Sequence, residues 1–267
     1  VGLDPYDIAL GDFNRDGKLD LVSANLDSND VSILLGVGDG TFSSATTYTS
    51  AGAGYGVESV DVNNDGTLDL VVKDLNHASI LLGNNDGTFK AATSYQIDGY
   101  GYSINDFNGD GKLDIASQYL GFNTDVSLGN GDGSFSAPSV YASLGDREVS
   151  SVDVNSDGIL DLVGSTGVAS TSLIVQFGNG NGSFKAPVSY SSGDYVDSII
   201  GADFNGDGAI DFLQAGQSSS ISLLLGNAVE TSGTLKAATS FASAATATDM
   251  RLFDFNLDGL DDIVTST

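Results

Sequence analysis

Apolar and polar residues alternate in short runs along the chain, and turn-forming residues interrupt the runs every few positions. Four such runs occur in the first fifty residues, at 7–13, 19–25, 31–36 and 41–49. Alternation with a period of two is typical of half-buried β-strands, and no stretch carries the 3.6-residue period of an amphipathic helix. The pattern therefore predicts an all-β protein built from short strands.

An acidic motif of nine residues, Asp-x-Asn-x-Asp-Gly-x-x-Asp, separates the first run from the second and occurs six times. Its copies begin at Asp12, Asp61, Asp106, Asp153, Asp203 and Asp254, at intervals of 49, 45, 47, 50 and 51 residues. A unit of four antiparallel strands that repeats every ~45 residues is typical of a β-propeller blade. A linear β-solenoid is disfavoured because its repeats are usually much shorter.

A glycine-rich motif separates the third run from the fourth. Its copies are LLGVGDGTF (34–42), LLGNNDGTF (81–89), SLGNGDGSF (127–135), QFGNGNGSF (176–184) and the divergent LLGNAVETSGTL (224–235). Asp-Gly or Asn-Gly between apolar runs predicts a tight hairpin. An aromatic residue stands six positions after each copy, at Tyr48, Tyr95, Tyr141, Tyr190 and Phe241. The fixed register of the four tyrosines predicts that they pack between blades.

We predict a single β-propeller domain over residues 1–267, made of four-stranded antiparallel blades. The expected blades are 6–50, 54–97, 100–142, 147–191, 196–242 and a partial blade at 248–267, about five and a half in all. A six- or seven-bladed ring would need a missing segment or a neighbouring chain to complete the last blade. Because the chain starts at Val1 without a methionine, we expect a mature product or a piece of a longer protein.

Charge and composition narrow the classes of partner. Asp and Glu outnumber Lys and Arg by 36 to 9, which gives a formal net charge of −27. Such a chain should be repelled by nucleic acid and by anionic membranes. No apolar run approaches the ~20 residues of a membrane span. The chain has no cysteine, which excludes disulfides and thiolate metal sites.

The acidic motif has the donor spacing of a metal-binding loop. Side-chain oxygens at positions 1, 3 and 5 can face one centre only if the backbone curls, and glycine at position 6 allows a turn with positive φ. An all-oxygen, anionic donor set favours Ca²⁺ over Mg²⁺ or Mn²⁺ and disfavours Zn²⁺ or Cu²⁺. The motif begins like an EF-hand but lacks the glutamate at position 12 and the flanking helices.

We therefore expect about six Ca²⁺ ions, one for each loop. The predicted side-chain ligands are Asp12, Asn14, Asp16 and Asp20; Asp61, Asn63, Asp65 and Asp69; Asp106, Asn108, Asp110 and Asp114; Asp153, Asn155, Asp157 and Asp161; Asp203, Asn205, Asp207 and Asp211; and Asp254, Asn256, Asp258 and Asp262. Position 7 would contribute its backbone carbonyl, at Lys18, Thr67, Lys112, Ile159, Ala209 and Leu260. The alternative is a set of Asx-rich turns without metal. Six crowded copies disfavour it, because unneutralised carboxylates repel one another.

These two motifs resemble the FG-GAP/VCBS repeats of integrin α-subunit propellers and of many secreted bacterial and fungal proteins. The resemblance covers essentially the whole chain. It implies a calcium-binding β-propeller outside the cell, usually with seven blades, in which the calcium loop joins the first two strands of each blade. The count of five and a half units departs from that number.

The resemblance favours an extracellular, calcium-stabilised recognition module for adhesion or carbohydrate binding, with a glycan or an extracellular protein as ligand. Fungal lectins resembling this family bind sugars in pockets between blades. Candidate sugar-stacking aromatics outside the repeated positions are Tyr55, Tyr100, Tyr102, Tyr119, Phe122 and Tyr195. Each of them could equally serve packing, as most aromatics do. A scaffold region of a larger surface protein, without a ligand of its own, is the alternative.

An enzyme, such as a propeller-type polysaccharide lyase, is disfavoured. The chain has one histidine, His77, in a turn-like setting, and few basic residues. No serine lies in a nucleophile-elbow sequence. Carboxylates that bind Ca²⁺ are held ionised and make poor proton shuttles. No constellation of catalytic groups can therefore be assembled from the sequence.

Overall fold

The computed structural model describes residues 1–50, 52, 54–97, 101–119, 123–145, 149–166, 171–192, 196, 198–216, 220–227, 233–243, 249–256 and 262–266. These residues form strands, turns and bends and contain no helix, so none of them forms a helix that could cross a membrane. The prediction of an all-β fold is confirmed.

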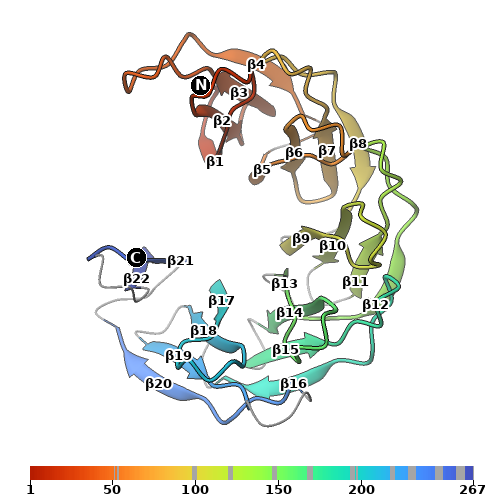
Figure 1. Ribbon diagram of the computed structural model, residues 1–267, viewed down its shortest axis with the longest axis vertical. Helices are drawn as coiled ribbons and strands as arrows, with labels where there is room; N and C mark the ends of the chain where they lie inside the picture. The colour runs from red at the N-terminus through yellow and green to blue at the C-terminus, as the bar shows by residue number, and fades with distance from the viewer. Residues whose placement is uncertain are drawn as a thin grey trace. The chain divides into compact units, whose positions relative to one another are not determined.

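The described strands form five four-stranded antiparallel sheets and one two-stranded sheet, each a meander in chain order (Figure 1). Each sheet is a propeller-type blade, as the repeat predicted. The first two blades comprise β1 (Pro5–Gly11), β2 (Asp20–Asn25), β3 (Asp30–Leu34) and β4 (Thr46–Thr49), then β5 (Gly56–Val60), β6 (Asp69–Lys73), β7 (His77–Leu81) and β8 (Thr93–Gln96).

The later blades repeat this plan. They comprise β9 (Gly101–Asn105), β10 (Asp114–Tyr119), β11 (Asn123–Ser127) and β12 (Ser139–Ala142); β13 (Val149–Val152), β14 (Asp161–Thr166), β15 (Ser172–Gln176) and β16 (Val188–Ser191); β17 (Ser198–Ala202), β18 (Asp211–Ala215), β19 (Ser220–Leu224) and β20 (Thr239–Ala242); and the pair β21 (Asp249–Phe253) and β22 (Asp262–Ser266). The predicted five and a half blades are therefore present.

The chain divides into two compact units. One comprises Val1–Gly99 with Gly111–Asp114 and Ser127–Ala137, and the other comprises Tyr100–Asp110, Ile115–Val126 and Pro138–Thr267. Each unit is described by itself below.

Within the first unit, the core lies between neighbouring blades. Val22 of β2 and Val31 of β3 share one buried cluster with Leu70 and Val72 of β6. Alternate residues of a strand point to the same face, so each blade offers one face to the blade before it and one to the blade after it. In the second unit Val163 of β14 packs in the same way within a cluster that includes residues of β18. Burial of these apolar faces is the main force that stacks one blade on the next.

Candidate functional site

The acidic loops join the first strand of each blade to the second, as the sequence predicted. In the first loop, Asp12 accepts hydrogen bonds from the main-chain N–H groups of Asp16 and Gly17, at 3.1 and 2.9 Å. Asn14 Oδ1 accepts from the N–H of Asp16 at 2.9 Å, and Asp16 Oδ1 accepts from that of Lys18 at 3.0 Å. The side chains at positions 1, 3 and 5 thus hold the curl of their own loop.

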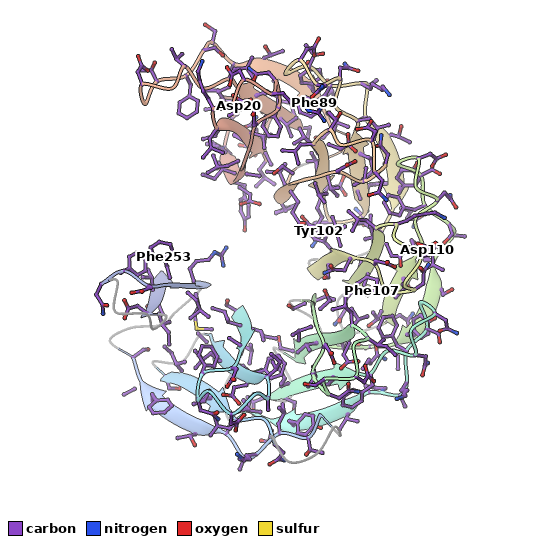
Figure 2. All side chains as sticks on the ribbon, in the orientation of Figure 1. Asp20, Phe89, Tyr102, Phe107, Asp110 and Phe253 are labelled. Atoms are coloured by element: carbon purple, nitrogen blue, oxygen red, sulfur yellow. The ribbon has the colours of Figure 1, made fainter. Side chains whose placement is uncertain are left out.

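The same network recurs in the second, fourth and fifth loops. These loops begin at Asp61, Asp153 and Asp203. In each, the side chain at position 1 accepts hydrogen bonds from the main-chain N–H groups of positions 5 and 6. The side chain at position 3 accepts from the N–H of position 5, and the side chain at position 5 accepts from the N–H of position 7. In the third loop, the N–H of Asp110 donates to Asp106 and Asn108 at 3.2 and 2.8 Å. Asp110 and Phe107 are labelled in Figure 2. In the sixth loop, Asp258 and Leu260 lie outside the described residues.

Two positions of the loop take left-handed backbone conformations. Glycine at position 6 has a φ of 80–86° in the five described copies, Gly17, Gly66, Gly111, Gly158 and Gly208, which confirms the predicted turn. Position 4 is also left-handed, with a φ of 56° at Arg15 and 57° at Asn64 and Ser156. Two further copies carry glycine at position 4, Gly109 and Gly206, and this substitution is the sequence sign of the same left-handed conformation.

The aspartate at position 9 has a role beyond the loop. Asp69 is fully buried, and its two carboxylate oxygens accept hydrogen bonds from the N–H groups of Val62 and Gly83, at 3.1 and 2.8 Å. Gly83 is the first glycine of the glycine-rich motif (81–89) in the same blade. Asp20, labelled in Figure 2, bonds in the same way to Phe13 and Gly36. The two motifs are separate in the sequence, whereas in the fold this carboxylate joins them.

The remaining copies of position 9 make the equivalent bonds. Asp161 accepts from Val154 and Gly178, Asp211 from Phe204 and Gly226, Asp114 from Gly129, and Asp262 from Phe255, all at 2.7–3.1 Å. The donor from the glycine-rich motif must be a glycine, because a Cβ on Gly36 would lie 2.2 Å from the carbonyl oxygen of Leu19.

The electrostatics of the loops fit a cation. Burial, and to a smaller extent the charges of Asp65 and Asp61, raise the pKa of Asp69 to about 6, although two backbone hydrogen bonds act in the opposite direction. Burial, with the charges of Asp157 and Asp153, likewise raises the pKa of Asp161 to about 6. Burial, with a smaller part from the neighbouring carboxylates, therefore disfavours the ionised form of the aspartate at position 9, and a bound cation would relieve this cost.

The donor chemistry of the loops also fits Ca²⁺, because the predicted ligands are all oxygens. Across the described residues, however, no group of three or more Asp, Glu, His or Cys side chains is gathered as a metal site. Their oxygens accept the loop's own N–H groups instead, and Lys18 Nζ lies 3.2 Å from Asp16 Oδ2. A carboxylate oxygen can accept more than one hydrogen bond or ligand, so these bonds and metal ligation are compatible.

The repeated aromatics pair across blades, as their register predicted. The rings of Tyr48 and Phe89 lie 5.8 Å apart in the first unit, and those of Tyr141 and Phe184 lie 5.7 Å apart in the second, both edge to face. Figure 2 labels Phe89. Tyr190 occupies the next equivalent position, but Leu235 stands where the other copies have phenylalanine.

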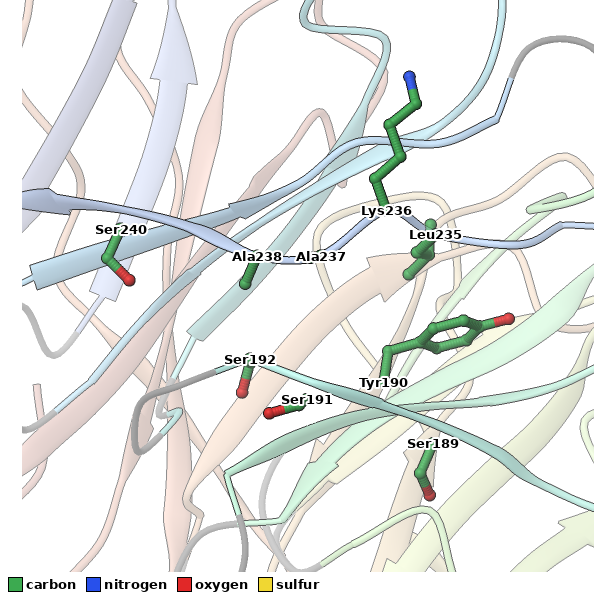
Figure 3. A pocket seen from close by; sticks show the side chains of 9 residues that line it. All are labelled: Ser189, Tyr190, Ser191, Ser192, Leu235, Lys236, Ala237, Ala238 and Ser240. Carbon is green, nitrogen blue, oxygen red and sulfur yellow. The ribbon is translucent and has the colours of Figure 1, made fainter.

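A hollow of about 450 Å³ lies where the phenylalanine is replaced. Its lining comes from two stretches of the second unit: Ser189, Tyr190, Ser191 and Ser192 of the fourth blade, and Leu235, Lys236, Ala237, Ala238 and Ser240 of the fifth. Figure 3 shows the Tyr190 ring beside Leu235, the Ser189 side chain on the other side of its strand from Tyr190, and the Lys236 side chain extending away from Tyr190. Leu235 lines this space at the position where the other repeats carry phenylalanine.

A row of polar side chains leads inward from the hollow. Ser240 Oγ lies 3.3 Å from Ser222 Oγ on the adjacent strand, and Ser222 is paired in register with Gln214. Gln214 is 1% exposed, and its amide nitrogen and oxygen have no hydrogen-bond partner among the described residues. Buried amides are normally satisfied, so polar groups capable of hydrogen bonding are expected near this row.

The comparisons with known proteins agree with this geometry. The sequence pattern of the FG-GAP-like repeat matches residues 12–72, 61–117, 106–164, 153–213 and 203–265. Each match begins at an acidic loop and extends to the second strand of the following blade. The chain belongs to the FG-GAP-like repeat family. A comparison with curated protein sequences gave no match.

Three solved structures share the fold of this FG-GAP repeat chain. A candidate 6-phosphogluconolactonase from Bacteroides uniformis is 14% identical, with a TM-score of 0.67 over 95% of this chain and 76% of that one. The V. cholerae biofilm matrix protein Bap1 is 18% identical, with a TM-score of 0.54 over 96% of this chain. The Photorhabdus luminescens Tc holotoxin pore is 17% identical, with a TM-score of 0.51 over 97%. The chain spans 42% of the Bap1 chain and 13% of the holotoxin chain.

The candidate sugar-stacking aromatics and the histidine of this FG-GAP repeat sequence lie in different environments. Tyr55 is half-buried and pairs edge to face with Tyr6, at 5.4 Å. Tyr102, labelled in Figure 2, is half-buried in β9. Tyr100, Phe122, Tyr195 and the side chain of Tyr119 lie outside the description. Neither Tyr55 nor Tyr102 lines the hollow, where the aromatic among the described residues is Tyr190, which the sequence pattern predicted to pack between blades. His77 Nδ1 lies 3.4 Å from Asp74 Oδ1.

Proposed function

We propose that this chain is an extracellular, calcium-stabilised recognition module for adhesion or carbohydrate binding, in which Ca²⁺ is structural. The observation that carries the recognition role is the hollow beside Tyr190. The recurring loop network supports the structural role of the metal. The proposal treats the module as non-catalytic, because the described carboxylates of the acidic loops accept main-chain hydrogen bonds and His77 lies beside Asp74.

The metal would be held by the oxygens at positions 1, 3, 5 and 9 and by the carbonyl at position 7 of each loop. When bound, Ca²⁺ supplies positive charge that offsets the repulsion between carboxylates of one loop. The loop's residues do the rest: glycine at position 6 sets the curl, and the carboxylate at position 9 ties the loop to the glycine-rich motif. Extracellular modules bind Ca²⁺ with dissociation constants of ~10⁻⁴–10⁻³ M, which suits an exposed loop outside the cell.

The hollow has the features of a small saccharide site. Its volume of about 450 Å³ is within the usual range for small-ligand sites, which is roughly 300–1,000 Å³. The Tyr190 ring offers an apolar face, and the hydroxyl of Ser240 on the opposite lining stretch offers a donor and an acceptor. An apolar ring face together with a hydroxyl group suits the mixed surface of a sugar ring.

An extracellular location follows from this proposal and is supported by the family. FG-GAP repeats occur in secreted and surface proteins, and one structural neighbour is by its name a biofilm matrix protein. The partner would then be a glycan or an extracellular protein. The high negative charge leaves uncharged or cationic surfaces as the favoured partners.

The proposal is tested on a glycan array with the 267-residue chain in Ca²⁺ and in EDTA. We expect calcium-dependent binding that is weakened in Leu235→Phe, which places the larger side chain of the other repeats in the hollow beside Tyr190. Phe184→Leu, the same exchange in reverse at Tyr141, is the matched control and should keep binding. A blank array, or binding that Leu235→Phe leaves intact, would refute the saccharide site.

A further inference from the structure

Two of the acidic loops place a glycine directly after the asparagine at position 3. The third loop has Asn108–Gly109 and the fifth has Asn205–Gly206, whereas the first and second loops carry Arg15 and Asn64 at position 4. The main-chain nitrogen of the following residue can attack the side-chain carbon of an asparagine. The attack is fastest when that residue is glycine, because no Cβ obstructs the approach. The third and fifth loops therefore hold a reactive pair that the first and second lack.

In the third loop, the groups around this pair favour the attack. The N–H of Gly109, which supplies the nucleophilic nitrogen, donates to Asp106 Oδ1 at 2.7 Å. The side-chain oxygen of Asn108, which becomes negative during the attack, accepts a hydrogen bond from the N–H of Asp110 at 2.8 Å. A carboxylate at the nucleophile and an N–H group at the developing oxyanion both assist such an addition.

The fifth loop has the same arrangement. The N–H of Gly206 donates to Asp203 Oδ1 at 2.8 Å, and Asn205 Oδ1 accepts from the N–H of Asp207 at 2.8 Å. Gly109 and Gly206 are both exposed, so water reaches the two pairs. The reacting groups belong to adjacent residues, so the fold holds them together at no further cost in entropy.

We propose that Asn108 and Asn205 are modification sites, at which the metal-free loop converts the asparagine to aspartate or isoaspartate. In the third loop, the Gly109 nitrogen bonds to the side-chain carbon of Asn108 and passes its proton to Asp106. The bond from that carbon to the side-chain nitrogen breaks, and the nitrogen takes up the proton and leaves as ammonia. Water then opens the cyclic imide at either of its two carbonyl carbons, which gives aspartate or isoaspartate.

The products change the charge and the main chain of the loop. Aspartate at position 3 adds a negative charge to a loop that already has three carboxylates. Isoaspartate also adds a carbon atom to the main chain between positions 3 and 4. That carbon displaces the N–H of position 5 from the oxygens that it contacts at positions 1 and 3. The inference requires neither bound Ca²⁺ nor a saccharide, so it stands apart from the proposed function.

Peptide mapping by mass spectrometry tests the proposal on the folded 267-residue chain, kept in mildly alkaline buffer over a time course. EDTA is included because a carboxylate that binds a metal is a poor proton acceptor. Asn108 and Asn205 should convert on the order of tenfold faster than Asn14 and Asn63, which accept the same hydrogen bond from position 5 but precede a larger residue. Enzymatic methylation of isoaspartate should label the two faster sites. Equal rates at the four asparagines would overturn the proposal.

Gly109→Ser should suppress the conversion of Asn108, while the fifth loop of the same molecule converts as before. The variant should fold, because a Cβ on Gly109 meets nothing within 4 Å and Ser156 holds the same loop position with a φ of 57°. Arg15→Gly is the converse change and should make Asn14 convert. Circular dichroism confirms that each protein is folded. Conversion of Asn108 that continues unchanged in Gly109→Ser would refute the attack by the Gly109 nitrogen.

Two further comparisons separate the geometry of the loop from the Asn-Gly sequence alone. Asn181–Gly182 in a glycine-rich turn has the same sequence, but the N–H of Gly182 donates to the carbonyl oxygen of Phe107 at 3.1 Å, a weaker base than a carboxylate. Asn181 should therefore convert more slowly than Asn108. Asp106→Asn keeps the Asn-Gly pair and removes the carboxylate, so it should slow the conversion of Asn108. Conversion in either case as fast as that of Asn108 in the parent chain would show that the carboxylate does not assist.

Discussion

The carboxylate of Asp69 accepts a hydrogen bond from the main-chain N–H of Gly83 at 2.8 Å, so the residue that closes an acidic loop also fixes the start of the glycine-rich turn. The two residues are far apart in sequence but belong to one blade. This bond makes position 9 a structural residue whether or not a metal is bound.

We predict that Asp69→Ala destabilises the protein more than Asp65→Ala when both are measured in EDTA. Asp69 is buried, so its loss leaves the N–H groups of Val62 and Gly83 without acceptors, at a cost on the order of 3 kcal/mol. Asp65 is exposed, and water can replace it on the N–H of Thr67. Urea unfolding measures the two changes. Equal losses would contradict a metal-independent role for position 9.

Calcium removal should lower the melting temperature, and added Ca²⁺ should restore it. The reason is that a cation bound to the folded loop would offset the burial of Asp69 and the nearby charges of Asp65 and Asp61, which together raise the pKa of Asp69 to about 6. Calorimetry in EDTA and in Ca²⁺ measures the shift. Identical melting curves in the two buffers would refute the metal sites.

The stoichiometry of bound metal provides a separate check. Asp157→Asn removes one charged ligand from the fourth loop, so we expect one Ca²⁺ fewer by equilibrium dialysis. Asp39→Asn is the control, since Asp39 lies in the first glycine-rich turn, where its Oδ1 accepts from the N–H of Thr41 at 2.9 Å. An unchanged count in Asp157→Asn would remove that residue from the ligand set.

Much of the fold was predictable because each blade carries its own local signals. The acidic motif, the Asp-Gly turn and the alternating runs act within one blade, and their repetition fixes the strand order. The link between Asp69 and Gly83 was not predictable, because a carboxylate at the end of a loop offers no sequence sign of which distant N–H it accepts. The hollow beside Tyr190 was equally hidden: the change from phenylalanine to Leu235 was visible, but its effect depends on packing between two blades.

Packing between blades should be strongly position-dependent within the repeated motif. Phe184 is 8% exposed and packs edge to face on Tyr141, whereas the equivalent Phe42 is 44% exposed. Phe184→Ala should therefore lower the free energy of unfolding by about 3–5 kcal/mol, and Phe42→Ala by much less. Chemical denaturation of both variants measures the difference. Similar losses of unfolding free energy in the two variants would show that burial of the phenylalanine does not determine how much its replacement destabilises the fold.

A buried lysine should make the stability of the first unit depend on pH. Lys73 of β6 is 3% exposed, and burial lowers its pKa from 10.5 to about 7, while Glu58 acts weakly in the opposite direction. Between these two values the unfolded chain binds a proton that the folded chain does not, so this residue's contribution makes stability rise with pH from about 7 to 10.5. Below pH 7 the folded protein carries the whole cost of burying the ammonium group.

Lys73→Met removes that cost, so the variant should gain most over the parent at pH 6, and the gain should shrink steadily toward pH 10. Differences in unfolding free energy at each pH measure it, since other titrating groups cancel between the two proteins. Lys90→Met, at an exposed lysine, should show no such trend. A difference for Lys73→Met that stays constant across this range would mean that the ammonium group is as well solvated in the fold as in the unfolded chain.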